Sequence, residues 1–371
     1  MESLGMKLDT PPVNADFWRA RHVLLTGHTG FKGTWATHWL SILGADVTGL
    51  ALAPDTVPSM FELTGARDCI AHHVCDIRDG SAVAAVVGKA DPELVLHMAA
   101  QPLVRRSVRE PVDTFATNVM GTVNLLEALR SAQRLKAVLV VTTDKVYENS
   151  ESGLAFCEED ALGGHDPYAA SKAACEIAVS SFARTYFAEK GIPVATARGG
   201  NVIGGGDFSE DRLVPDIWRA MQKGEALRVR YPRATRPWQH VLDCLAGYLT
   251  YLAALAEGRT TERALNFGPE PGSPMMVAEI VASMQQALGT RTAYVLDEGP
   301  KPREMLALTL NSERARNSLN WSDRLPGEAA LQATAGWYKA LADGEDMRRF
   351  TLYQIDAFMT ARAGQLAHAE R

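Results

Sequence analysis

The chain has 371 residues, 46% hydrophobic and 22% charged, which is enough to bury a large core and is unlike the composition of a disordered protein. A formal net charge of -6 argues against a general binder of nucleic acids or of anionic membranes. The five cysteines form no C-x-x-C pair, the histidines show no metal-ligand spacing, and no run of about 18 apolar residues is present. We therefore expect a cytoplasmic protein with reduced thiols and no bound metal, whose partners include neither nucleic acid nor membrane.

Strands and helices alternate through the first half of the chain. Residues 1–18 are polar and read as a loosely held arm that precedes the fold. Apolar runs then predict strands at 22–26, 46–53, 69–75, 94–98, 137–141 and 193–197. Helical patterns lie between them at 31–43, 81–87, 118–132 and 171–189. This alternation predicts an α/β fold of Rossmann type, a doubly wound parallel sheet with helices on both faces.

The alternation stops close to residue 200. The region that follows is rich in Gly, Pro and Arg, and its C-terminal part is mostly helical. Its predicted elements are helices at 242–255 and 276–288 and a short strand at 264–267. We expect a dinucleotide-binding Rossmann domain at 20–200, to which the helix near 240–258 returns, and a smaller mixed α/β substrate lobe at 201–371.

Three glycines with G-x-x-G-x-x-G spacing separate the first expected strand from the first helix. Such glycines allow a tight turn and a close approach of backbone to a pyrophosphate, which the positive end of the helix attracts. We predict that a dinucleotide binds to this loop, at residues Gly27, Thr29, Gly30, Phe31, Lys32 and Gly33. The acidic residue expected about 20 positions later, which would bind the ribose of NAD, is missing from the segment 50–54. No Arg or Lys stands there either, so NAD is favoured and NADP stays open.

The carboxyl ends of neighbouring parallel strands meet in one crevice, which is where ligands bind in such sheets. Small and polar residues follow the third, fourth and fifth expected strands and start the next helix. We expect the following residues beside the cofactor: Asp76, Ile77, Ala99, Ala100, Gln101, Asn118 and Thr142. Two of them have simpler interpretations, because Asp76 could cap a helix and Asn118 could be a helix cap or a core amide.

An acid–base centre is predicted at the end of the fifth strand, where Thr143, Asp144 and Lys145 follow a β-branched run. Tyr168 and Lys172 are four residues apart, which places both on one face of a helix. A nearby ammonium favours the phenolate form and so lowers the pKa of a tyrosine. Alone, a Tyr–Lys pair at this spacing also occurs in ordinary amphipathic helices.

Longer motifs give these residues a family context. The glycine loop, Ala99-Ala100-Gln101 and Tyr168-x-x-x-Lys172 resemble those of the extended short-chain dehydrogenase/reductase family. A narrower set resembles the CDP-glucose 4,6-dehydratase branch: Gly30-Phe-Lys-Gly33, Thr117-Asn-Val-Met-Gly121, Thr143-Asp-Lys145, Asp166-Pro-Tyr168, Arg198-Gly-Gly-Asn-Val-Ile-Gly-Gly-Gly-Asp207 and Arg236-Pro-Trp-Gln-His240. The resemblance extends from about residue 17 to about residue 340.

The resemblance implies an NAD-dependent dehydration of CDP-glucose to CDP-4-keto-6-deoxyglucose in deoxysugar biosynthesis. It implies that Tyr168 takes the C4 hydroxyl proton while NAD accepts the C4 hydride, that Thr143 bonds to that hydroxyl, and that Lys172 holds the nicotinamide ribose. Asp144 would then protonate the C6 hydroxyl as water leaves across C5 and C6, and the hydride would return to C6. Lys145 stands where dTDP-glucose relatives have Glu, so it is either the C5 base or a cation that positions the substrate.

The same resemblance places the sugar nucleotide at Gln101, Asn201, Arg212, Leu213, Arg236, His240 and Asn266. Three other functions stay open: a 4,6-dehydratase for another nucleotide hexose, a sugar-nucleotide 4-epimerase, and a silent NAD-binding regulator. An epimerase needs no elimination pair such as Asp144 and Lys145, and a silent binder needs no Tyr168.

Assembly as a homodimer or a homotetramer is also implied, because the helices at 118–132 and 171–189 pair across a two-fold axis in relatives. The apolar residues Ile177, Val179 and Phe182 suit such pairing, and they equally suit packing on the sheet.

Overall fold

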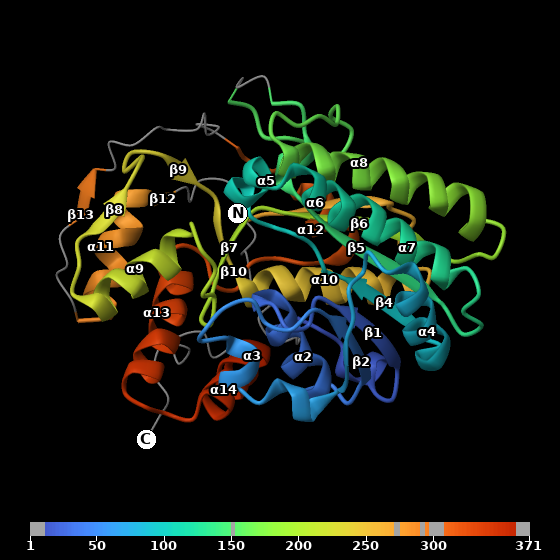
Figure 1. Cartoon of the computed structure of the whole chain (residues 1–371), viewed down its shortest axis with the longest axis horizontal. Helices are drawn as coiled ribbons and strands as arrows, with labels where there is room; N and C mark the ends of the chain where they lie inside the picture. The colour runs from blue at the N-terminus through green and yellow to red at the C-terminus, as the bar shows by residue number, and fades with distance from the viewer. Residues whose placement is uncertain (1–11, 150–152, 271–274, 290–293, 297–307, 361–371) are drawn as a thin grey trace, which may run out of the picture.

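The computed structural model describes residues 12–149, 153–270, 275–289, 294–296 and 308–360 of the chain. One seven-stranded sheet has the order β11-β6-β5-β4-β1-β2-β3, and every neighbouring pair is parallel (Figure 1). Its strands are β1 (His22–Thr26), β2 (Asp46–Ala51), β3 (Ala71–Val74), β4 (Leu94–His97), β5 (Ala137–Thr143), β6 (Val194–Gly199) and β11 (Ala264–Phe267). This order, with helices between the strands, confirms the predicted doubly wound α/β fold.

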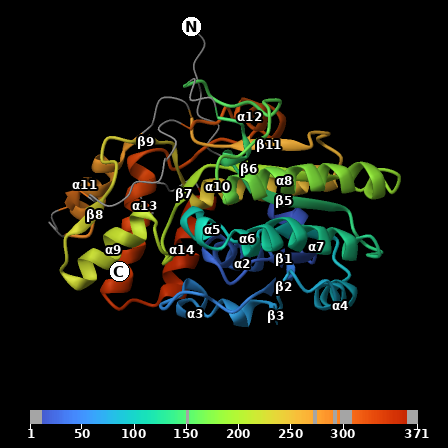
Figure 2. The same ribbon diagram turned by 45° about the horizontal axis from the view of Figure 1, so that its top comes forward.

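Helices cover both faces of the sheet (Figure 2). One face carries α4 (Gly80–Ala90), α7 (Gly121–Leu129) and α8 (Pro167–Phe182), and the other carries α2 (Phe31–Ile42) and α10 (Val241–Ala256). Side chains of β1 alternate between the two cores, since Val23 and Leu25 belong to the core of α2 and α10, and Leu24 belongs to that of α4 and α7. Burial on both faces requires nearly continuous apolar strands, which is why the sequence predicts them well.

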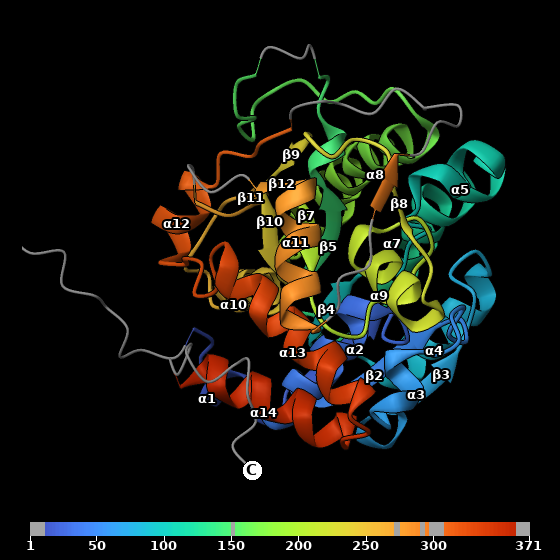
Figure 3. The same ribbon diagram turned by 90° about the vertical axis from the view of Figure 1, so that its left-hand side faces the viewer.

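A smaller group of elements, here called the second lobe, lies mostly on the left in Figure 1 and faces the viewer in Figure 3. Its strands form three pairs: β7 (Asn201–Ile203) with β10 (Trp238–His240), β8 (Leu227–Val229) with β13 (Tyr294–Leu296), and β9 (Thr235–Arg236) with β12 (Met275–Met276). Its helices are α9 (Leu213–Lys223), α11 (Val277–Ala287) and α13 (Glu328–Ala342). Within the described ranges, no helix combines the length and apolar character that crossing a bilayer requires.

The chain returns from the second lobe to the main sheet. Helix α10 packs against β4 and β5, and β11 pairs with β6 as the edge strand. Helix α12 (Glu313–Leu319) contacts both α10 and β11, and α14 (Met347–Met359) packs on α2. Elements from the last third of the chain therefore complete the body that the first half begins.

The start of α8 differs from the expected position at residue 171. The helix begins at Pro167, because the side chain of Asp166 accepts a hydrogen bond at the helix N-terminus and proline suits the first helical position. Tyr168 therefore lies in the first turn of the helix, one turn before Lys172, as their spacing predicts.

The expectation that Asn118 begins a helix is wrong. Helix α6 (Pro111–Phe115) continues through one π-helical turn, Ala116–Met120, directly into α7. Asn118 is 1% exposed within that turn. Of the two simpler interpretations of Asn118, the core amide is therefore confirmed and the helix cap is wrong.

The N-terminal arm is more closely packed than its composition indicates. Residues 1–11 lie outside the described residues, but α1 (Ala15–Trp18) is a short helix capped by Asn14. Val13, Phe17 and Trp18 belong to the main core. The expectation of a loose arm is wrong for residues 13–18, because these apolar side chains find a surface of the folded protein that no local pattern reveals.

We expect Trp18→Ala to lower the free energy of unfolding by about 3–5 kcal/mol, because it removes an aromatic side chain from the core. Urea denaturation followed by circular dichroism measures this change. Arg19→Ala is the control, since the Arg19 side chain is 75% exposed, and it should change the free energy by less than about 0.5 kcal/mol. Small and equal effects of the two substitutions would contradict the packing of this segment.

Candidate active site

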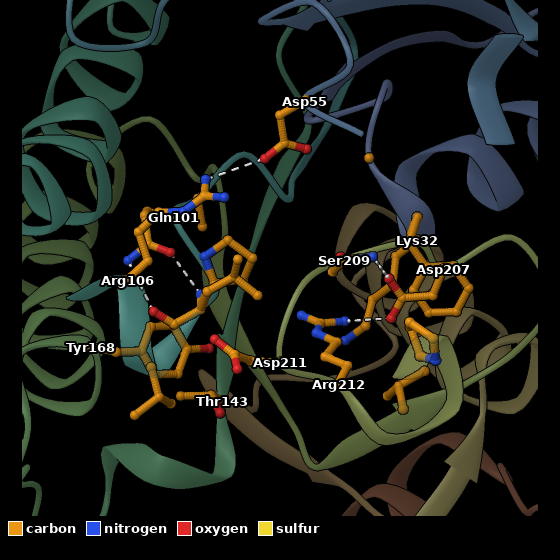
Figure 4. Close-up of a pocket in the computed structure, with 18 of the residues that line it drawn as sticks. Lys32, Asp55, Gln101, Arg106, Thr143, Tyr168, Asp207, Ser209, Asp211 and Arg212 are labelled. Carbon is orange, nitrogen blue, oxygen red and sulfur yellow. Dashed lines mark hydrogen bonds and ion pairs between the residues drawn. The ribbon is translucent and has the colours of Figure 1, made fainter. Parts of the chain in front are cut away.

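A cavity of about 1400 Å³ lies between the carboxyl ends of the strands and the second lobe (Figure 4). Most residues that the sequence assigns to a cofactor or a substrate line it: Gly27, Thr29, Gly30, Phe31, Lys32, Gly33, Asp76, Ile77, Ala99, Ala100, Gln101, Thr142, Thr143, Lys145, Tyr168, Lys172, Asn201, Arg212 and Leu213. They come from the loops after β1, β3 and β4, from the end of β5, from α8 and from the second lobe. The fold therefore brings them together in one continuous space.

Several expected site residues do not line the cavity. Asn118 and Asp144 are buried outside its lining, and each contacts a residue that does line it. His240 accepts a backbone hydrogen bond as the cap of α10, and Asn266 is buried at the sheet edge. The side chain of Arg236 lies outside the described residues, although its backbone belongs to β9.

The glycine loop forms an open cradle at the N-terminus of α2. Gly27 has a φ of 75°, a left-handed conformation that favours glycine. A Cβ atom on Gly33 would lie 2.0 Å from the Gly27 carbonyl oxygen, so no larger residue fits there. Gly30 caps the helix and places no side chain between its first N–H groups and the cavity. These features fit the pyrophosphate of a dinucleotide, whose negative charge the helix N-terminus attracts.

Hydrogen bonds with the side chains of Thr26 and Asn118 fix the backbone that follows β4. The Thr26 hydroxyl oxygen accepts a hydrogen bond of 3.1 Å from Ala99 N–H. The Asn118 side chain accepts one from Gln101 N–H at 2.8 Å and donates to Gln101 O and Ser171 Oγ. Asn118 therefore ties the strand-end segment to α8, and this lets the cofactor lie against backbone at the cavity floor.

Two carboxylates stand at the end of the cavity next to β2 and β3. Asp76 accepts hydrogen bonds of 3.0 and 2.9 Å from Arg78 Nε, whereas Asp79 caps α4, so the helix-cap interpretation of Asp76 is wrong. Asp55 follows β2 and also lines the cavity. The sequence analysis missed Asp55, because this residue stands just after the segment 50–54, where a ribose-binding acid is expected. A search for acidic residues over the whole loop after β2 would have found it.

Tyr168 is buried at the cavity wall. Burial raises the pKa of its phenol, whereas the positive charge of Lys145 and a hydrogen bond with the Thr143 side chain lower it. The sequence attributed this lowering to Lys172. The Lys172 ammonium instead donates a hydrogen bond of 3.0 Å to Val141 O, and burial lowers its pKa. Lys145 is therefore the cation with the larger effect on the phenol.

Asp144 begins a short 3-10 turn, Asp144–Val146, directly after β5. Its Oδ1 atom accepts hydrogen bonds from Thr143 Oγ1 at 2.9 Å and from Lys145 Nζ at 3.2 Å. Its Oδ2 atom has no hydrogen-bond partner among the described residues and faces Gly200, where a Cβ atom would be 3.6 Å away. A buried carboxylate oxygen without a partner is costly, so a polar group of a ligand would be a suitable partner for it.

A row of ion pairs that the sequence did not indicate crosses one wall of the cavity. Figure 4 shows one of them, between Arg106 and Asp55. On α5 (Val104–Arg109), Arg106 contacts Asp55 at 3.2 Å and Glu210 at 3.2 Å, and Arg105 contacts Asp211 at 2.7 Å. These pairs join the loop after β2 to the second lobe. Their members are between 51 and 106 positions apart, so no spacing rule finds them.

Arg212, which the family resemblance assigns to the substrate, also has a carboxylate partner. Asp207 Oδ2 accepts a hydrogen bond of 2.9 Å from its guanidinium (Figure 4). Burial tends to lower the pKa of Arg212, but the charge of Asp207 outweighs it and the pKa is raised. Three arginines therefore line the cavity and can hydrogen-bond phosphate oxygens, Arg105 and Arg106 on one wall and Arg212 on the other.

Comparison with known proteins places this site in a family. The chain matches the model of the NAD dependent epimerase/dehydratase family over residues 23–268. It is 40% identical over 355 residues to the CDP-glucose 4,6-dehydratase of Salmonella typhimurium, which covers 94% of this chain and 99% of the relative. It is 28% identical over 335 residues to the dTDP-glucose 4,6-dehydratase of Xanthomonas campestris pv. campestris, which covers 85% of this chain and 92% of the relative.

A solved structure shows the same fold. The dTDP-glucose 4,6-dehydratase of Bacillus anthracis, in complex with NAD, matches with a TM-score of 0.70 and 24% identity over 90% of this chain and 100% of that one. The family model spans the chain from β1 to the end of the sheet at β11, and the glycine cradle and the Tyr168 site lie within that span. The chain therefore belongs to the NAD-dependent epimerase/dehydratase family.

Proposed function

We propose that the protein is a hydro-lyase that dehydrates CDP-glucose to CDP-4-keto-6-deoxyglucose with NAD as its cofactor. The main support is the single cavity that joins the glycine cradle to Tyr168 and Lys145 and reaches the arginines beside the second lobe. The relative from Salmonella typhimurium bears the name of this activity. Its 40% identity, against 28% for the dTDP-glucose relative, favours CDP as the nucleotide.

Residues of the cavity wall would hold NAD along its length. We assign the pyrophosphate to the cradle of Gly27, Gly30 and Gly33, the adenosine end to Asp76, and the nicotinamide ribose to Lys172. When bound, NAD supplies an acceptor for the C4 hydride and afterwards a donor for C6. The proton transfers of the reaction fall to the side chains of the protein.

Tyr168 is the residue that we assign to remove the proton from the C4 hydroxyl. Thr143 can hydrogen-bond that hydroxyl and orient it toward the phenol oxygen. Burial keeps the pKa of Tyr168 above its ordinary value and so opposes formation of the phenolate, and Lys145, Thr143 and Arg212 reduce this rise. Lys145, which the family resemblance linked to the second step, thus also supports the first.

Asp144 is the residue that we assign to protonate the C6 hydroxyl as it leaves. Its unpartnered Oδ2 atom supports this role, while Thr143 and Lys145 hold its Oδ1 atom. The elimination also requires a base for the C5 proton, and we assign this step to Lys145, whose Nζ atom lies beside Asp144 at the cavity wall and takes the proton as the neutral amine. In its charged form the same side chain holds Asp144 and acts on Tyr168.

The nucleotide of the substrate would bind on the side of the second lobe. Asn201, Arg212 and Leu213 line that part of the cavity, with Arg105 and Arg106 on the opposite wall. We propose an NAD-binding domain at 20–200 and a sugar-nucleotide lobe at 201–371. In this division, α10 and β11 come from the second range but pack on or pair with the main sheet.

We also propose a homodimer or a homotetramer in the cytoplasm. Five apolar side chains are exposed on neighbouring segments, namely α5, α6, the π-helical turn and α8: Val108, Val112, Phe115, Met120 and Ile177. Such a patch is typical of a protein–protein interface. Val179 does not contribute, because it is buried in the core beneath α8, and Phe182 is partly buried against that core. The free thiols of all five cysteines support a reducing compartment.

The proposed activity is tested by incubating the purified protein and NAD with CDP-, dTDP-, UDP- or GDP-glucose, and following the alkali-induced absorbance of a 4-keto sugar. We expect product from CDP-glucose. Product from none of the four donors would contradict the dehydration, and product only from another donor would contradict the choice of nucleotide.

The roles assigned to Tyr168 and Asp144 predict different kinetic defects when each residue is substituted. Tyr168→Phe removes the base of the first step and should slow reduction of the cofactor by about 10²–10⁴-fold. Asp144→Asn should still allow that reduction but slow the elimination, so that reduced nicotinamide accumulates and 4-keto-6-deoxy product does not. Single-turnover absorbance of the nicotinamide, compared with product formation, separates the two steps. Equal loss of both steps in Asp144→Asn would contradict its role as the acid.

The assembly is tested by the double substitution Val112→Glu, Ile177→Glu, which places two charges in the exposed apolar patch. We expect it to convert the oligomer to monomers, as measured by size-exclusion chromatography with light scattering. Ile42→Glu is the control, because Ile42 is 49% exposed on α2, at the other face of the sheet. A wild-type protein that is already monomeric would contradict the proposal.

A further inference from the structure

Arg198, near the end of β6, lies at the centre of a buried polar network. Its side chain is 5% exposed, as is that of Glu176 on α8. Arg198 Nε and one terminal nitrogen donate hydrogen bonds of 3.0 Å to the two oxygens of Glu176. The same carboxylate accepts hydrogen bonds from Thr142 at 2.5 Å and Thr196 at 2.7 Å. Both charges are thus fully compensated, which a buried ion pair requires.

The other terminal nitrogen of Arg198 extends the network to the residue that follows the Asp144–Val146 turn. It donates a hydrogen bond of 2.8 Å to the Tyr147 hydroxyl, which in turn donates one of 2.6 Å to Asn266 Oδ1. The Asn266 amide nitrogen donates to Phe156 O and Asn311 O, so its oxygen must be the acceptor. Asn266, expected at the substrate, is instead the outer end of this network.

The acid–base centre has two parts, helix α8 with Tyr168 and Lys172 and the Asp144–Val146 turn, and the network contacts both. Glu176 is four residues beyond Lys172 and eight beyond Tyr168, so it shares their helix face and anchors α8 to β5 and β6. Tyr147 directly follows the turn that carries Asp144 and Lys145. Arg198, Glu176 and Tyr147 themselves lie outside the lining of the cavity, which runs between these two parts.

We infer that Arg198 and Tyr147 are positioning residues that hold the elimination turn in register with the Tyr168 helix. This inference rests on the proposed dehydration, because it assigns Tyr168 on α8 to the oxidation at C4 and the Asp144–Val146 turn to the elimination of water. One guanidinium serves Glu176 and Tyr147 simultaneously, so a shift of the turn relative to the helix requires breaking a buried, charge-assisted hydrogen bond.

A substitution at Tyr147 can distinguish a positioning role of the network from a general structural one. Burial raises the pKa of its phenol, so it stays neutral and both accepts from Arg198 and donates to Asn266. Its ring is stacked on Phe156 with 4.9 Å between the centroids. Tyr147→Phe therefore keeps the ring packing and removes only the hydroxyl that fixes the turn, while Glu176 and α8 retain their contacts.

The test compares the two steps of the reaction in Tyr147→Phe with CDP-glucose as substrate. We expect formation of the 4-keto-6-deoxy product to fall by about tenfold or more, since small displacements of a catalytic group have such effects. Reduction of the nicotinamide should fall by a clearly smaller factor, because Tyr168 stays in place and only the charge of Lys145 shifts, so that the reduced form accumulates. Arg198→Lys should give the same split, because an ammonium can pair with Glu176 but cannot also reach the Tyr147 hydroxyl in the fork geometry of arginine.

The control is Tyr251→Phe, which removes another buried phenol hydroxyl, bonded to Glu262 O at 2.9 Å and outside the lining of the cavity. It should leave both steps unchanged. If Tyr147→Phe slows both steps equally, or slows neither, the positioning role is wrong while the dehydration stands. If the wild-type protein forms no product from CDP-glucose, the proposed function itself fails, and the inference fails with it.

Discussion

The main sheet is parallel and buried on both faces, and this constraint determines where chemistry can take place. Polar side chains within the strands would have to find partners inside an apolar layer, so they gather where the strands end. Because all strands point the same way, their carboxyl ends lie along one side of the sheet. Thr26, Thr143 and Arg198 stand on that side, on β1, β5 and β6. The cradle, the acid–base residues and the second lobe all depend on it.

Features that belong to one short segment could be predicted from the sequence. The strand β5 is buried throughout, so its apolar run was clear, and the Gly27–Gly33 spacing is a local property of one turn. Once the order of strands and helices was predicted, the convergence of the strand ends followed from geometry alone. The family motifs then assigned roles to Thr143 and Asp144, which the end of the predicted fifth strand had already placed beside Tyr168.

Features that depend on two distant segments could not be predicted. Arg105 meets Asp211 across 106 positions, and neither residue has a local pattern that distinguishes it from a solvated surface charge. The motif residues His240 and Asn266 show a related difficulty, because a motif contains residues that build a site as well as residues that touch its ligand. Only the packing shows that His240 caps a helix and that Asn266 orients a tyrosine.

The late position of the edge strand β11 bears on how the chain folds during its synthesis. The first six strands leave the ribosome by Gly199, yet β6 keeps an open edge until residues 264–267 pair with it. The face of β4 and β5 that α10 covers also stays bare over much of this interval. A nascent chain of this length exposes both an unpaired strand and an apolar surface, the two features that promote aggregation. Residues 200–263 are therefore the interval of synthesis over which the incomplete sheet presents these two features together.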